Sequence, residues 1–92
     1  MKSRTTKHYR KRLAELPKHV QKAAKSNYRK WRENPKHPSL NFKKHEGLSA
    51  KAKEDIYSVR IGEHWRAVGV YIKRDDAIAW FWVGSHEDYN RL

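Results

Sequence analysis

The sequence predicts an α+β fold in which an N-terminal helical hairpin packs on one face of a small antiparallel meander sheet. Three observations support this prediction. Apolar residues recur at helical spacing early in the chain, three strand-like apolar runs follow later, and a proline-rich turn separates the two halves. Consecutive strands with short turns form a meander that amphipathic helices can cover. We expect one domain over residues 1–92, a length that allows a single modest core.

The N-terminal half predicts a short edge strand followed by two helices. Residues 3–6 include two threonines, which suit a strand whose edge is protected by charge. A helix of about two turns is expected from Lys7. Pro17 interrupts this helix and suits the first turn of a second one. The apolar stripe of the first helix is Tyr9, Leu13 and Leu16, and that of the second is Val20, Ala23, Ala24, Tyr28 and Trp31.

The C-terminal half predicts strands. Leu40–Lys43 alternates as a short half-buried strand, and Gly47–Lys53 has the small, polar composition of an exposed loop. Three longer strands are expected beyond this loop, of which the last has the continuous apolar character of a strand buried on both faces. They are Ile56–Ile61, Trp65–Ile72 and Ile78–Val83.

Positive charge is concentrated in the first half of the chain. Residues 1–44 hold 15 lysines and arginines against two glutamates, a net charge of +13, whereas residues 45–92 hold 7 against 8 acids, a net charge of −1. A one-sided basic patch of this kind indicates a polyanionic partner, either a nucleic acid or an acidic protein. The plain alternative is a solvated helix surface, which is what many charge runs are.

Several classes of protein are excluded by composition. The sequence has no cysteine, and therefore no disulfide, thiol nucleophile or thiolate metal ligand. The first twelve residues are polar and basic without the apolar core of a signal peptide, and no apolar stretch approaches the length of a transmembrane helix. We therefore expect a cytoplasmic protein that does not contact membranes.

Two isolated arginines and the segment after the last strand are the candidate functional residues. Arg60 and Arg66 lie in otherwise apolar strands, so each must reach an edge, a partner or a ligand. They share a face only if the turn between them has an odd number of residues or a bulge, because a two-residue turn would pair Ile61 with Arg66. His86 and Tyr89 follow the last strand. On the face away from the helices, these side chains would surround a patch suited to phosphate.

Metal-free cleavage of RNA is the chemistry that such a patch suits. RNA carries its own nucleophile, the 2′-hydroxyl, so the protein must move two protons and stabilise negative charge at phosphorus. The arginines can stabilise the negative charge at phosphorus, His86 can carry either proton transfer, and Tyr89 can stack on a base. Alternatively, His86 is structural and the arginines anchor an acidic partner or Glu87 and Asp88.

Other chemistries fit the sequence poorly. The six histidines are scattered without the close pairing or carboxylate clustering that a metal site requires. Ser85 and His86 are adjacent, and no strained elbow surrounds the serine, so a serine nucleophile is unsupported. We expect no metal and no small-molecule cofactor.

The order of two helices and five motifs resembles the RelE/ParE superfamily of type II toxin–antitoxin toxins, and the likeness covers nearly the whole chain. The motifs are Leu16-Pro17-x-x-Val20-Gln21 between the helices, then Asn34-Pro35-x-x-Pro38-Ser39-Leu40-x-Phe42-Lys43, Ile56–Gly62, Trp65-Arg66-Ala67 and Trp80–Tyr89. The last is similar to the Gly-x-His-x-Asp ending of HigB-like and YafQ-like members, in which the histidine takes part in cleavage.

This resemblance implies a small toxin that cuts mRNA in the ribosomal A site as a metal-independent endoribonuclease and that is blocked by an acidic antitoxin. Its partners would be mRNA, the ribosome and that antitoxin. Ser58 stands where RelE itself often has lysine, and His64 and the pair Lys43 and Lys44 are candidates to supply the missing positive charge. The implied catalytic residues are Arg60, Arg66, His86 and Tyr89, and the candidate RNA-binding residues are Lys43, Lys44 and His64.

Two other readings remain open. ParE-like toxins resemble this fold but inhibit DNA gyrase by binding, without cutting nucleic acid. A third possibility is a member that binds RNA without cleaving it. The His86 ending favours the ribonuclease.

Overall fold

A computed structural model describes all 92 residues. Its five strands form one sheet with the order β1-β5-β4-β3-β2. The α+β fold is as predicted: β3, β4 and β5 form the antiparallel meander, while β1 pairs with β5 in parallel and makes the sheet mixed. No helix combines the length and the apolar character needed to cross a membrane. The strands are β1 (Lys2–Thr5), β2 (Lys43–Lys44), β3 (Asp55–Ile61), β4 (Trp65–Ile72) and β5 (Ala77–Ser85), and the helices are α1 (Lys7–Ala14), α2 (Lys18–Glu33), α3 (Glu46–Ala52) and α4 (His86–Asn90).

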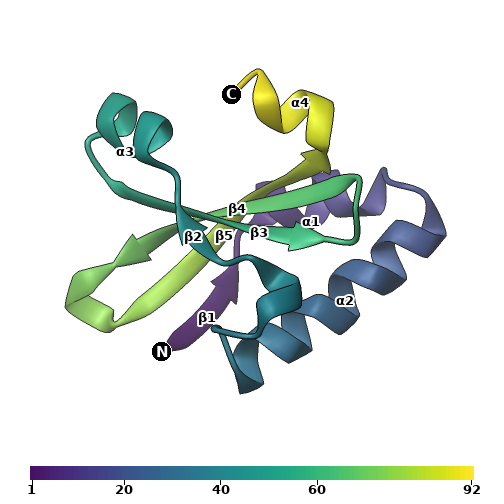
Figure 1. Ribbon diagram of the computed structural model, residues 1–92, viewed down its shortest axis with the longest axis horizontal. Helices are drawn as coiled ribbons and strands as arrows, with labels where there is room; N and C mark the ends of the chain where they lie inside the picture. Colours follow the sequence, from purple (N-terminus) through teal and green to yellow (C-terminus); the bar gives the residue numbers. More distant parts are fainter.

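The main core lies between the sheet and the hairpin of α1 and α2. Figure 1 shows α2 on one side of the sheet and α3 and α4 on the other. Trp31 of α2 meets Trp80 of β5 edge to face, with ring centroids 5.5 Å apart. The Trp80 indole donates a hydrogen bond to the Ser3 hydroxyl, which joins β1 to this core. Such aromatic packing stabilises a small domain beyond the area that it buries.

A second, smaller core covers the opposite face of the sheet. Its buried members are Ile56, Val68 and Trp82, against which α3 and α4 pack. A bulge at Phe81 interrupts the pairing of β5 with β4, because Val68 lies opposite Trp82 while the next residue, Gly69, lies opposite Trp80. The extra residue turns Trp80 and Trp82 to opposite faces, so each core receives one tryptophan.

The predicted strand at Leu40–Lys43 is wrong. Pro38–Leu40 forms a 3-10 turn, and the strand is limited to Lys43–Lys44. The turn places Leu40 entirely inside the core, and Asn41 follows in the left-handed conformation with φ 46°. A tight turn that buries every second residue gives the same apolar alternation as a strand, which is why the pattern misled.

The predicted exposed loop at Gly47–Lys53 is also wrong, because Glu46–Ala52 forms α3. The helix is specified by its ends: the His45 side chain caps the first turn, and Lys53 ends it in the left-handed conformation with φ 56°. Its buried Ser49 exchanges two hydrogen bonds with the backbone of Ile56 on β3. A helix held by caps and one polar anchor needs no long apolar stripe.

Candidate active site

Arg60 and Arg66 lie directly opposite each other on β3 and β4. The turn between these strands has three residues, Gly62 to His64, which confirms the odd-numbered turn required for the two side chains to share a face. Their neighbours Ile61 and Ala67 point into the main core, so the arginines lie on the face away from the hairpin. Gly62 has φ 63°, a conformation that glycine adopts without strain.

Neither arginine has a carboxylate partner. The sequence allowed a pairing with Glu87 or Asp88, but neither acid reaches them, and Asp88 instead lies 3.6 Å from Arg91. Partial burial, together with the positive charge of Arg60, lowers the pKa of Arg66. Arg60 is exposed and Arg66 is partly buried, and neither guanidinium has a carboxylate partner. Their like charges disfavour each other, and a bound anion would relieve this repulsion.

His86 and Tyr89 are brought to this face by α4, a helix that the sequence did not predict. It begins directly after β5 because the Ser85 hydroxyl accepts a hydrogen bond from the Asp88 backbone and caps the first turn. Tyr89 packs on the second core, and its hydroxyl donates to the buried hydroxyl of Ser58 on β3, 3.0 Å away. The exposed His86 ring lies nearly parallel to the Tyr89 ring, with centroids 6.4 Å apart.

Ser58, which stands where RelE often has lysine, holds Tyr89 by a hydrogen bond. Lys43 on β2 lies directly opposite Ser58 on β3, so the Lys43 side chain shares the face of the arginines. Lys44 points to the other face and lies 3.2 Å from Asp55, whose hydrogen bond raises the pKa of Lys44. Of the two lysines, the structure brings only Lys43 to the site.

His64 lies in the exposed turn between β3 and β4. Its carbonyl oxygen accepts a hydrogen bond of 2.7 Å from the His86 backbone, so the turn and the start of α4 are adjacent. The His64 ring itself is solvent-exposed near Glu63. No group of three or more histidine, aspartate or glutamate side chains converges in a way that could hold a metal ion.

His45 is a site residue that sequence reasoning missed. Its ring meets Tyr89 edge to face at 5.4 Å, while its Nδ1 accepts a hydrogen bond from the backbone of Leu48. Tyr89 is thus held by Ser58 at its hydroxyl and by His45 at its ring. His45 could have been recognised as the N-cap of α3, but the sequence analysis predicted a loop for that segment and so left no helix to cap.

Comparison with known proteins agrees with this architecture. Residues 18–91 match the family model of the ParE-like toxin domain. No curated protein sequence matches significantly.

Two solved structures are similar in fold across almost their entire length. A chain of the RelE–RelB complex of the archaeon Pyrococcus horikoshii OT3 has 20% sequence identity and a TM-score of 0.67, with 91% of this chain and 92% of that chain covered. A metal-bound toxin from Helicobacter pylori has 16% identity and a TM-score of 0.62, with 96% and 97% covered. Since the family model spans most of the chain and the fold agrees, the chain belongs to the ParE-like toxin domain family and is a toxin of the RelE/ParE superfamily.

Proposed function

We propose that this toxin is a metal-independent endoribonuclease that cleaves mRNA on the ribosome. The observation that carries the proposal is the opposed pair Arg60 and Arg66, which lacks any carboxylate partner and lies on the same face as Tyr89. A face that keeps two guanidiniums unpaired is suited to a phosphate group. The proposal includes the ribosome because the sequence resembles RelE-like toxins, which cut mRNA in the ribosomal A site.

RNA supplies the nucleophile for the proposed reaction. A base takes the proton of the 2′-hydroxyl, the 2′-oxygen bonds to phosphorus, the bond from phosphorus to the 5′-oxygen breaks, and that oxygen takes up a proton. The products are a 2′,3′-cyclic phosphate and a 5′-hydroxyl. Arg60 and Arg66 would stabilise the charge that develops on the phosphoryl oxygens. His86 would carry one of the proton transfers, for which its exposed ring is free. The fixed ring of Tyr89 would stack on a base.

Induced expression in a bacterium, followed by primer extension on abundant mRNAs, tests this proposal. We expect growth arrest and cleavage within translated regions. His86→Ala and Arg66→Ala should each abolish both, with an unchanged melting temperature, because neither residue belongs to a buried core. Arg74→Ala is the matched control, since Arg74 is exposed at the other end of the sheet, in the turn before β5. Full toxicity of both site variants would exclude the ribonuclease.

A second candidate is a ParE-like toxin that inhibits DNA gyrase by binding, which the matched family favours by its name. In that case growth would stop while mRNA stays intact, and His86→Ala would remain toxic. Inhibition of gyrase supercoiling by the purified protein would then identify the target.

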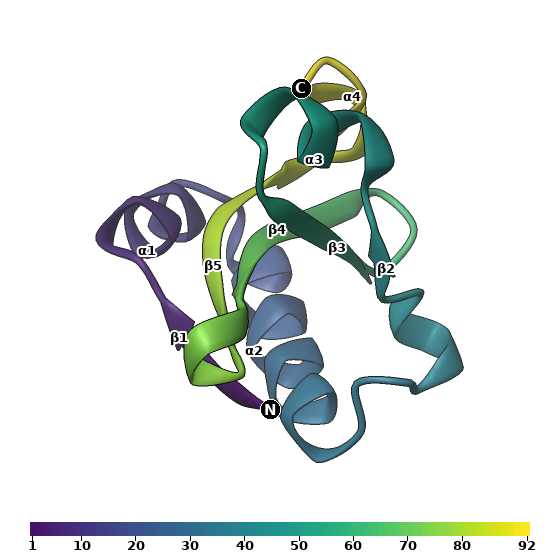
Figure 2. The same ribbon diagram turned by 90° about the vertical axis from the view of Figure 1, so that its left-hand side faces the viewer.

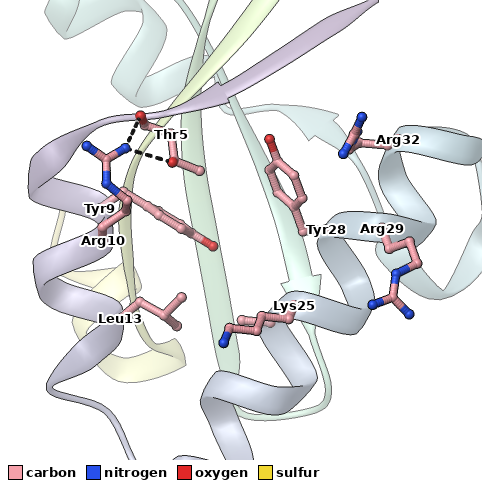
Figure 3. A pocket seen from close by; sticks show the side chains of 9 residues that line it. Thr5, Tyr9, Arg10, Leu13, Lys25, Tyr28, Arg29 and Arg32 are labelled. Atoms are coloured by element: carbon pink, nitrogen blue, oxygen red, sulfur yellow. Dashed lines mark hydrogen bonds between the residues drawn. The ribbon is translucent and has the colours of Figure 1, made fainter.

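The hairpin face supports an acidic antitoxin as partner. A groove of about 420 Å³ lies between α1, α2 and β1 (Figure 3). Its apolar lining lies among four cationic side chains, none of which forms an ion pair, although Arg10 donates hydrogen bonds to Thr5. An amphipathic segment with apolar and acidic residues would complement this groove. The groove is lined by Thr5, Tyr9, Arg10, Leu13, Ala24, Lys25, Tyr28, Arg29 and Arg32.

Charge reversal tests the groove separately from the reaction. Lys25→Glu with Arg29→Glu should keep toxicity but weaken rescue by a co-expressed antitoxin. Rescue that is as efficient as with the wild type would place the antitoxin elsewhere.

A further inference from the structure

The outer edge of β5 is only half covered by another strand. β1 pairs with β5 from Ala77 to Trp80, and the remainder of β5 has no strand on that side. Figure 2 shows α1 beside β5 there. Arg12 of α1 compensates for the missing strand, because its Nε donates a hydrogen bond of 2.8 Å to the Val83 carbonyl.

The guanidinium of Arg12 continues past this edge onto the face of the arginine pair. Its Cζ lies 4.8 Å from the centroid of the Trp82 ring. A Cβ added to Gly84 would lie 3.0 Å from the Arg12 Nη2 and 2.7 Å from a Trp82 ring carbon. Since Gly84 lies directly opposite Arg66, that Cβ direction marks the Arg66 face. The terminal nitrogens of Arg12 therefore lie above Gly84, next to the strand of Arg66.

Arg12 is held in place yet retains free donors. Its only hydrogen bond uses Nε, and it forms no ion pair. Trp82, which is 8% exposed, makes a cation–π contact that helps to hold the guanidinium in place. The Nη groups thus present a rigid set of donors to a ligand at little entropic cost. Glycine at position 84 leaves the space that Trp82 and Arg12 occupy.

We propose that Arg12 is an RNA-phosphate-binding residue, which completes with Arg60 and Arg66 a row of three guanidiniums across β3, β4 and the edge of β5. The proposal rests on the ribonuclease function proposed above. Neighbouring strands are about 4.8 Å apart, so the row extends over roughly 10 Å. A row of this length exceeds one phosphate group, so Arg12 would hold the RNA backbone beside the phosphate that Arg60 and Arg66 bind. Trp82 acts as a positioning residue because it orients Arg12.

Arg12→Gln separates this role from a purely structural one. The side-chain amide nitrogen of glutamine is as many bonds from Cα as the Nε of arginine, so it can keep the hydrogen bond to Val83 while the guanidinium is lost. We expect an unchanged melting temperature and a roughly tenfold or greater loss of mRNA cleavage, in line with a lost charged hydrogen bond. Arg74→Gln removes the same charge far from the site and should cleave like the wild type.

A second measurement uses the wild-type protein and does not depend on any variant folding. In ¹⁵N NMR spectra of the arginine side chains, a short single-stranded RNA should shift the signals of Arg12, Arg60 and Arg66 over the same concentration range and leave Arg74 unaffected.

The outcomes distinguish the two proposals. Shifts confined to Arg60 and Arg66, or full cleavage by Arg12→Gln, would overturn the role of Arg12 alone. Failure of the wild type both to bind the RNA and to cleave mRNA would overturn the ribonuclease, and the role of Arg12 with it.

Discussion

Replacement of Trp80 by alanine is the sharpest test of the main core. Trp80 is 2% exposed, meets Trp31 at 5.5 Å and Phe42 at 6.3 Å, and donates a hydrogen bond to Ser3. Truncation of a buried tryptophan costs about 3–5 kcal/mol. A domain of this length has a free energy of unfolding of roughly 5–14 kcal/mol. Trp80→Ala should therefore remove a large part of the stability and lower the melting temperature by roughly 20 °C.

Urea unfolding followed by circular dichroism measures this loss. Trp65→Ala serves as the control, because Trp65 is half-buried at the margin of the same core and should cost less. Gly69→Ala adds a geometric check: its new Cβ would lie 2.8 Å from the Trp80 ring and 2.9 Å from Ile78. Such overpacking costs about 1–3 kcal/mol. The cost should be smaller in the Trp80→Ala background, where the contact with the Trp80 ring is gone and only that with Ile78 remains. Equal costs in both backgrounds, or a Trp80→Ala protein as stable as the wild type, would refute this packing.

Three further predictions concern single contacts. Burial raises the pKa of Tyr9 to about 12 from 10.0. The neutral form of Tyr9 therefore stabilises the fold below pH 10, and this stability is lost as the pH rises through 12. Measured by urea unfolding, the free energy of unfolding of the wild type should fall by about 3 kcal/mol more than that of Tyr9→Phe across this titration. Tyr89→Phe should cost about 1–3 kcal/mol because it orphans the buried Ser58 hydroxyl. The double variant with Ser58→Ala should cost less than the sum, and additive values would argue against this bond. Lys43→Ala should reduce mRNA cleavage in cells more than Lys44→Ala, and equal effects would contradict their placement on opposite faces.

The sequence predicted the meander correctly and stated the condition under which Arg60 and Arg66 would share a face, because both depend on local rules. Alternation over Ile56–Ile61 sets which side chains share a face, and the length of the following turn sets the register with Trp65–Ile72. Arg60 and Arg66 had to meet once the turn had three residues. The roles predicted for His86 and Tyr89, which directly follow a buried strand, stay predictions.

The errors share a physical cause, which is that short elements are specified by their ends or by distant partners. α3 depends on the His45 cap and on the anchor of Ser49 to Ile56, neither of which gives a periodic pattern. The parallel pairing of β1 with β5 joins segments at opposite ends of the chain, so no local signal reveals it. The role inferred for Arg12 was equally hidden, because it depends on where β1 ends and how α1 packs against the uncovered edge.

The two faces of the sheet differ in composition: one carries the larger core and the other carries three arginines. The hairpin face buries Trp31 and Trp80 in the larger core, and this core supplies most of the apolar burial of the fold. The opposite face keeps Arg12, Arg60 and Arg66 without carboxylate partners, and partial burial together with the charge of Arg60 lowers the pKa of Arg66. Of the small core on this face, Trp82 contacts the guanidinium of Arg12. These neighbouring positive charges make this face suited to an extended polyanion, since successive phosphate groups would meet successive guanidiniums.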